Sequence, residues 1–402
     1  MRMTARIVRV VLVGLSFCLS SSAQITSMKL LTPQVGWAAN GQSLFWTADG
    51  GTHWKDITPQ TTVKEVISSV FFLDASTGWV LLAHGDQDDR AIFDLASTTD
   101  SGANWHTGHV AIPDLKKRQY ILRGQGDIDF VDQSHGWMSL DVESSANSRI
   151  GILLATKDGG TSWAWPPDSP GVAGRIHFAD ARNGWLAGGP GDEHVYVTHD
   201  GSKTWQELLL KAPAEVSLAH QASYDSPPVC SDSVHCFLPV TYSAPERSGS
   251  ALVLFVSQDG GQSWTPSSIV AGLKEISPSQ VFASAMAGST WVVISTPGGR
   301  PALTTVESGT HPNTLRPDVS VPDSPFLRSS FANRACAWIF SEGKLLSTLD
   351  GGMSWVDVTP PLRPSEAPMR GTPPRTRPSS EPKADNQKSS GSACAEPEMM
   401  LV

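Results

Sequence analysis

The chain has 402 residues, with 30 Lys and Arg against 39 Asp and Glu and a formal net charge of −9. An acidic chain has no excess of cations to neutralise phosphates, which argues against a general nucleic-acid binder. The 35 Gly and 29 Pro favour a turn-rich chain over a helical one. Trp (14) outnumbers Tyr (4), which indicates one structural position that Trp fills repeatedly.

Residues 1–23 have the features of a secretory signal. Arg2, Arg6 and Arg9 precede an apolar run over residues 10–19, and small residues follow up to Ala23. This order of basic, apolar and small residues is typical of a cleaved signal peptide. We therefore expect an exported chain, periplasmic or extracellular, that starts at Gln24 and has no transmembrane segment.

An eight-residue pattern, Ser/Thr-x-Asp-x-Gly-x-x-Trp, occurs six times, with Ser202 in place of Gly in one copy. A short Asp side chain can accept backbone N–H bonds inside a tight turn, and Trp can pack the hairpin against its neighbour. Six copies cannot all be one active site. We therefore interpret the aspartates as holding turns: Asp49, Asp100, Asp158, Asp200, Asp259 and Asp350.

A second motif, Phe-x-Asp-x-x-x-Gly-Trp, precedes the first and is clearest at residues 72–79, 130–137 and 178–185. Weaker copies lie at 30–37, 230–237 and 331–338. Trp264 and Trp355 of the first pattern are 91 residues apart, about twice the other intervals, so a degenerate unit is expected between them, around residues 281–311. Residues 24–359 then hold seven units of about 48 residues, a length that suits a four-stranded blade.

Each unit is predicted to form four short strands, which in the second unit cover residues 65–73, 78–83, 91–98 and 104–110. The predicted fold is all-β: a seven-bladed β-propeller of four-stranded antiparallel blades over residues 24–359, with the aspartate pattern at the turn between the third and fourth strands. Residues 360–402 contain nine Pro and no aromatic residue, so a disordered Pro-rich tail is expected there.

The two motifs resemble those of the bacterial neuraminidase (BNR, Asp-box) repeat superfamily. The Phe-x-Asp-x-x-x-Gly-Trp motif is especially similar to that of the photosystem II stability and assembly factor family of seven-bladed propellers. The resemblance covers residues 25–359. It implies a non-catalytic propeller that acts as a protein-binding or assembly scaffold, because the photosynthetic members are non-enzymatic assembly factors on the lumenal side of the membrane. We therefore expect an envelope protein as the partner, and a monomeric chain.

The alternative is a carbohydrate-active propeller that binds or cleaves a glycan, since sialidases share the aspartate pattern. Their Arg-Ile-Pro signature is absent, and the nearest string is Arg175-Ile176-His177. Asp127 and Asp129 lie on a predicted inner strand and could form a catalytic carboxylate pair facing the central channel. Inner-strand polar residues that bridge neighbouring blades are the favoured interpretation.

Candidate binding residues lie on connections that vary between the units, where a rigid scaffold commonly presents its functional side chains. They are expected on the face opposite the aspartate turns. One group is a basic cluster that could contact an anionic partner, and the other could contact a protein or a glycan: Lys116, Lys117, Arg118, Tyr120 and Arg123; and Asp192, His194 and Tyr196.

No metal and no cofactor are predicted, because no zinc-ligand spacing occurs and the carboxylates at residues 86–89 are better explained as a solvated acidic loop. Cys230 and Cys236 fall on either side of a predicted hairpin turn, so a disulfide is predicted between them. Cys336 precedes Trp338, which favours a packing role in the core.

Overall fold

A computed structural model describes residues 24–362, with gaps at 62–63, 86–89, 143–149, 191–193, 215, 217–220, 225, 231, 244–249, 274–280, 287–288, 295–301, 308–312, 317–327 and 334. These residues belong to one compact unit. The candidate residue Asp192, the acidic loop at residues 86–89 and nearly all of the predicted tail lie outside the described residues. None of the described helices is long and apolar enough to cross a membrane.

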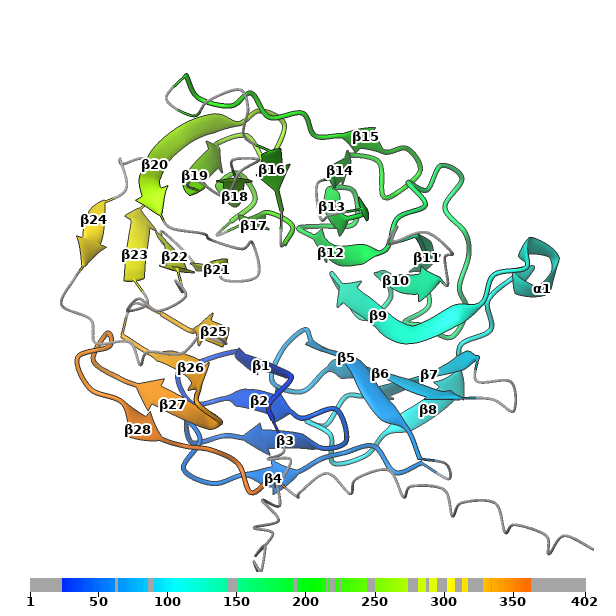
Figure 1. The fold of residues 1–402 in the computed structure, drawn as a ribbon. Helices are drawn as coiled ribbons and strands as arrows, with labels where there is room; N and C mark the ends of the chain where they lie inside the picture. Colours follow the sequence, from blue (N-terminus) through cyan, green and yellow to red (C-terminus); the bar gives the residue numbers. More distant parts are fainter. Residues whose placement is uncertain are drawn as a thin grey trace, which may run out of the picture. The chain divides into compact units, whose positions relative to one another are not determined.

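Short strands make up nearly all the regular structure (Figure 1). The elements are β1 (Ser27–Leu30), β2 (Gly36–Ala39), β3 (Leu44–Thr47), β4 (Lys55–Asp56), β5 (Val66–Phe72), β6 (Gly78–Gly85), β7 (Ala91–Thr98), β8 (His106–His109), α1 (Leu115–Arg118), β9 (Leu122–Phe130), β10 (Gly136–Val142), β11 (Gly151–Thr156), β12 (Gly174–Phe178), β13 (Gly184–Gly188), β14 (His194–Thr198), β15 (Gln206–Glu207), β16 (Gln221–Ser223), β17 (Val229–Cys230), β18 (Cys236–Ser243), β19 (Ser250–Ser257), β20 (Thr265–Leu273), β21 (Val281–Met286), β22 (Ser289–Ile294), β23 (Ala302–Glu307), β24 (Asn313–Arg316), β25 (Arg328–Phe331), β26 (Ala337–Ser341), β27 (Lys344–Thr348) and β28 (Val356–Asp357).

The described strands form seven antiparallel sheets in which strands that follow one another in the chain pair side by side. The predicted four-stranded antiparallel blade is confirmed for β1–β4, β5–β8, β12–β15, β21–β24 and β25–β28. The sheet β21–β24 occupies the 91-residue interval in which a degenerate unit was expected. Figure 1 shows the sheets following one another around a β-propeller, with β1, β5, β9, β12, β17, β21 and β25 innermost.

Two sheets depart from the predicted count of four strands, and proline explains both. The sheet β9–β11 has three strands, and only a single bridge, from Ala155 to Ala164, stands where a fourth would lie. Pro166 and Pro167 follow that bridge, and proline has no N–H to extend a ladder. The sheet β16–β20 has five strands because Pro227 and Pro228 interrupt the inner strand and separate β16 from β17.

Aromatic stacking joins neighbouring sheets. The Trp of a second strand lies flat against the Phe that ends the inner strand of the next sheet: ring centroids are 3.9 Å apart for Trp79 and Phe130, and 3.4 Å apart for Trp137 and Phe178. The motif glycine makes room for this Phe, because a Cβ atom at Gly136 would collide with the ring of Phe130. The Phe-x-Asp-x-x-x-Gly-Trp motif is therefore a packing unit between blades, which accounts for the excess of Trp over Tyr.

The predicted disulfide between Cys230 and Cys236 is confirmed. The two cysteines are direct partners across the β17–β18 hairpin. Cys336 is a free, buried cysteine beside β26.

Candidate functional site

The six aspartate turns share one hydrogen-bond pattern. In the first, the Thr47 hydroxyl donates to the Asp49 carboxylate at 2.8 Å and accepts the Gly51 amide at 2.9 Å. The same carboxylate accepts the backbone amide of His53 at 2.9 Å. Hydrogen bonds from the residue four positions after the aspartate keep its pKa below the ordinary value. The pKa is about 2 for Asp49, Asp100, Asp200, Asp259 and Asp350, and it is also lowered for Asp158.

Each aspartate turn is tied to the first turn of its own sheet. The residue after the aspartate donates its amide to a carbonyl there, for example Gly50 to Gln34 at 2.7 Å and Gly351 to Ala335 at 2.9 Å. Both turns of a blade therefore lie at the same end. Because every carboxylate is engaged inside its own turn, these aspartates stabilise the scaffold rather than face a ligand.

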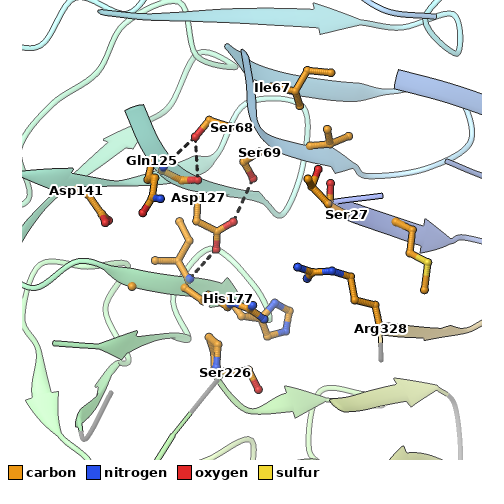
Figure 2. A pocket seen from close by; sticks show the side chains of 18 of the residues that line it. Ser27, Ile67, Ser68, Ser69, Gln125, Asp127, Asp141, His177, Ser226 and Arg328 are labelled. Atoms are coloured by element: carbon orange, nitrogen blue, oxygen red, sulfur yellow. Dashed lines mark hydrogen bonds between the residues drawn. The ribbon is translucent and has the colours of Figure 1, made fainter. Parts of the chain in front are cut away.

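The inner strands surround a cavity of about 900 Å³ (Figure 2). Its lining includes Ser27 of β1, Ser69 of β5, Asp127 of β9, His177 of β12 and Arg328 of β25. This is the central channel in which a catalytic carboxylate pair was considered. Its polar groups come from segments up to 300 residues apart in the chain, so the closed ring alone brings them together.

Asp127 bridges three neighbouring sheets across this channel. Its carboxylate accepts the Ser69 hydroxyl at 3.1 Å and the Ile176 amide at 3.0 Å, as Figure 2 shows. Burial raises its pKa, and the Ile176 amide and the Arg175 charge oppose that rise. The carboxylate therefore satisfies an amide at the free edge of β12, which the ladder of that blade leaves unpaired.

Asp129 has the same role two residues further along β9. Its carboxylate accepts the Phe178 amide at 2.5 Å and lies 3.4 Å from Nδ1 of His177. Lys29 on β1 has an exposed surface. Desolvation by the surrounding protein nevertheless lowers the pKa of its ammonium group, and the negative charge of Asp129 opposes that lowering. Both carboxylates thus bond to the backbone of the next blade, which agrees with the bridging interpretation of these two residues.

The first four residues of the basic cluster lie in the connection between β8 and β9, which projects beyond the sheets at α1 (Figure 1). The guanidinium of Arg118 stacks 4.3 Å from the centre of the Trp165 ring, and the ring of Tyr120 lies 6.3 Å from the same ring. The Trp165 indole donates a 2.7 Å hydrogen bond to the carbonyl of Pro113, which fixes it against this connection. Sequence reasoning missed Trp165, because its partners lie 45 to 52 residues earlier in the chain.

Lys117 and Arg123 of the basic cluster have other neighbours. Lys117 forms an exposed ion pair with Asp114 at 2.7 Å, and Lys116 lies in α1. Arg123, on β9, lines a separate cavity of about 460 Å³ together with residues of β6. The cluster therefore divides into a compact group around Trp165 and an arginine beside the second sheet.

His194 and Tyr196, the described members of the second group of candidates, lie on a different blade. His194 on β14 contacts the Glu207 carboxylate on β15 at 2.7 Å, and its ring stacks on Tyr196. Burial raises the pKa of Tyr196, and Glu207 adds to that rise. These residues sit on the outer strands of the sheet β12–β15, whereas the Arg118 group follows β8, so the two groups are separate sites on the scaffold.

No protein-family model matches the sequence, and no curated protein does. Solved structures do match. YCF48 bound to D1 peptide has a TM-score of 0.50 and 16% identity over 82% of this chain and 92% of that one. The BP39L lectin from Burkholderia pseudomallei has a TM-score of 0.50 and 13% identity over 84% and 99%. An ancestral GH74 enzyme has a TM-score of 0.53 and 12% identity over 84% of this chain, which spans 46% of that enzyme.

At these identities the likenesses show the fold alone. The protein is a β-propeller with antiparallel four-stranded blades, an architecture that hosts a peptide-bound protein, a lectin and a glycoside hydrolase among its solved examples. Its function has to be argued from its own residues.

Proposed function

We propose that this chain is an exported, non-catalytic propeller of seven blades that binds a protein partner in the cell envelope. The observation that carries the proposal is the exposed group formed by Arg118, Tyr120 and Trp165 at α1. The seven described sheets support the blade number, and the signal-like residues 1–23 support export. The acidic charge supports a partner other than nucleic acid, and we propose a monomeric chain.

The Trp165 group has the composition of a protein-binding hot spot. Trp, Tyr and Arg dominate the binding energy of protein interfaces, because each presents a large rigid surface with a polar end. Arg118 and Tyr120 are exposed, and Trp165 is half-buried and fixed in place by its bond to Pro113. Ile121, 40% exposed, extends the apolar surface. A preformed surface of this kind loses little side-chain entropy when a partner covers it.

The channel carboxylates support a non-catalytic role. An acid/base pair in a glycosidase has to reach the scissile bond, with one group available to donate a proton. Asp127 and Asp129 instead accept backbone amides from the next blade. Moving either carboxylate toward a substrate would leave an amide of β12 without a partner. Among the similar folds, YCF48 in its complex with D1 peptide gives a precedent for protein binding by a propeller.

Glycan binding is the second candidate, and the same exposed aromatic rings favour it. A Trp or Tyr face can stack on the apolar face of a sugar, and the BP39L lectin shows that such a fold is used by a lectin. The two candidate functions differ in their dependence on charge. Reversing the charge at Arg118 should strongly weaken the binding of an acidic protein partner and should change the binding of a neutral sugar little.

The deciding experiment is photo-crosslinking of the exported full-length chain in its native envelope, with a photoreactive amino acid at position 120. We expect one cross-linked protein, which is lost from the same probe in the Trp165→Ala and Arg118→Glu backgrounds. Lys203→Glu is the matched control, because it reverses an exposed charge on an aspartate turn of another blade. Equal labelling in all backgrounds would overturn the proposal, and binding to a neutral glycan array lost only in Trp165→Ala would establish the second candidate.

A further inference from the structure

Three metal-ligating side chains gather on one face of the sheet β5–β8. Glu65 directly precedes β5, His84 lies on β6 and Asp94 lies on β7. Each offers one ligand atom, and these atoms all lie within 4.8 Å of one another. No sequence motif announces this group, because its members are 10 and 19 residues apart and meet only through strand pairing.

The register of the sheet explains why they meet. Asp94 is the direct partner of Leu82 on β6, two residues before His84, so Asp94 and His84 share a face of the sheet. Val66 pairs with Ala83, which places Glu65 beside His84 on that same face. Asp94 also pairs with His109 on β8, whose Nδ1 lies 3.1 Å from the Asp94 carboxylate.

The unmet hydrogen-bonding capacity of the group points to a ligand. Oε2 of Glu65 and Nδ1 of His84 are both shielded from solvent, and neither has a hydrogen-bond partner among the described residues. A buried polar atom without a partner costs free energy that a bound ion would recover. Two carboxylates also face each other here, since the ligand atoms of Glu65 and Asp94 lie within 4.8 Å of one another.

We infer that Glu65, His84 and Asp94 form a binding site for a divalent transition-metal ion, with Zn²⁺ as the favoured occupant. One imidazole nitrogen and two carboxylate oxygens are a donor set that suits zinc, whereas calcium and magnesium sites use oxygen donors. Ligand atoms around tetrahedral zinc lie roughly 3.3 Å apart, so small side-chain rotations close the present separations. The His109 ring beside Asp94 supports the carboxylate from outside, as partners of metal ligands commonly do.

The site can be tested by isothermal titration of the full mature chain with Zn²⁺ alone, with the His84→Gln and Glu65→Gln variants alongside. We expect one zinc ion per chain and at least a tenfold loss of affinity in each variant. His194→Gln is the matched control, because His194 contacts one carboxylate, that of Glu207, and the described residues place no third metal-ligating group beside it. An unchanged affinity in His84→Gln, or an equal loss in His194→Gln, would overturn the inference.

A spectroscopic arm keeps the test independent of variant folding. Co²⁺ bound to the unmodified chain should give visible absorption typical of nitrogen and oxygen donors, displaced by one equivalent of Zn²⁺. A sulfur-to-cobalt charge-transfer band would place the ion on a cysteine and refute the site. Loss of binding on neutralising Asp86, Asp88 and Asp89, with His84→Gln still binding normally, would assign the ion to the acidic loop and refute it as well.

Discussion

The indole nitrogen of Trp54, in the first sheet, donates a 2.7 Å hydrogen bond to the carbonyl oxygen of Val358, in the last sheet. Trp105 makes the equivalent bond of 2.7 Å to Ile57, one sheet earlier in the chain. Val358 therefore takes the place that Ile57 has at an ordinary boundary, and the last sheet stands next to the first. All four strands described in the last sheet come from the C-terminal side, so among the described strands none is exchanged, and side chains link the two sheets.

Trp54→Phe should weaken this closure, because it removes the indole N–H and part of the ring that packs against Trp338. The variant leaves the Val358 carbonyl without its indole donor, and we expect a loss of about 1 kcal/mol in the free energy of unfolding. Urea denaturation followed by tryptophan fluorescence measures it. Trp163→Phe is the control, because Trp163 donates to Gly160 within its own turn. If ring closure matters, Trp54→Phe alone should speed proteolysis near both ends of the propeller; equal digestion of the two variants would speak against it.

The aspartate turns predict how stability depends on pH. Their folded pKa values lie below the ordinary aspartate value, so their contribution is present above pH 4 and is lost as the pH falls from about 4 to about 2. Asp200→Asn removes the carboxylate that accepts the Thr204 amide and hydroxyl. We expect the variant to be less stable than the unmodified chain at pH 7 and equally stable near pH 2.

Thermal unfolding between pH 2 and pH 7 measures that difference. Lys203→Gln serves as the control, because it changes one charge in the same turn and leaves the carboxylate in place. A stability gap between Asp200→Asn and the unmodified chain that stays constant over this pH range would show that the ionised carboxylate is not what holds the turn.

The repeated features of this fold could be predicted from the sequence because one physical solution recurs. The second sheet has strands at the predicted places, within two residues at most of the boundaries, since its apolar alternation and turn residues agree. The Cys230–Cys236 disulfide followed from its place in the repeat. The partners in the singular features could not be predicted, although a bridge between blades was the favoured interpretation of Asp127. The bond from Ile176 to Asp127 spans 49 residues, and the stack of Arg118 on Trp165 spans 47, and neither belongs to the repeat.

Asp129 provides a test of the bridging role of the channel carboxylates. Asp129→Ala would leave the buried Phe178 amide unpaired, and we expect the free energy of unfolding to fall by about 2 to 3 kcal/mol. Asp129→Asn keeps an acceptor oxygen, so its loss should be about 1 kcal/mol. Asp168→Ala, at an exposed turn, is the control and should lie within about 0.5 kcal/mol of the unmodified chain. Equal losses for the Ala and Asn variants of Asp129 would exclude the hydrogen bond as the cause.

Ser202, the one departure from glycine among the six aspartate turns, has a backbone φ of 68°, in a region that favours glycine. Its hydroxyl accepts a 3.0 Å hydrogen bond from the buried indole of Trp137 in the preceding sheet. Ser202 therefore adopts a strained backbone conformation, and its hydroxyl pairs an indole N–H that would otherwise lack a partner. Ser202→Gly removes both the strain and the bond, whereas Ser202→Ala removes only the bond.

We therefore expect Ser202→Ala to lower the free energy of unfolding by about 2 kcal/mol, and Ser202→Gly by about 1 kcal/mol less than that. Trp137→Phe removes the donor instead of the acceptor, and in that background the cost of Ser202→Ala should nearly vanish. A double-mutant cycle by urea denaturation measures the coupling between the two side chains directly. Additive losses would mean that Ser202 does not stabilise the fold through the Trp137 indole. The difference in stability between the Ala and Gly variants would then report the backbone strain alone.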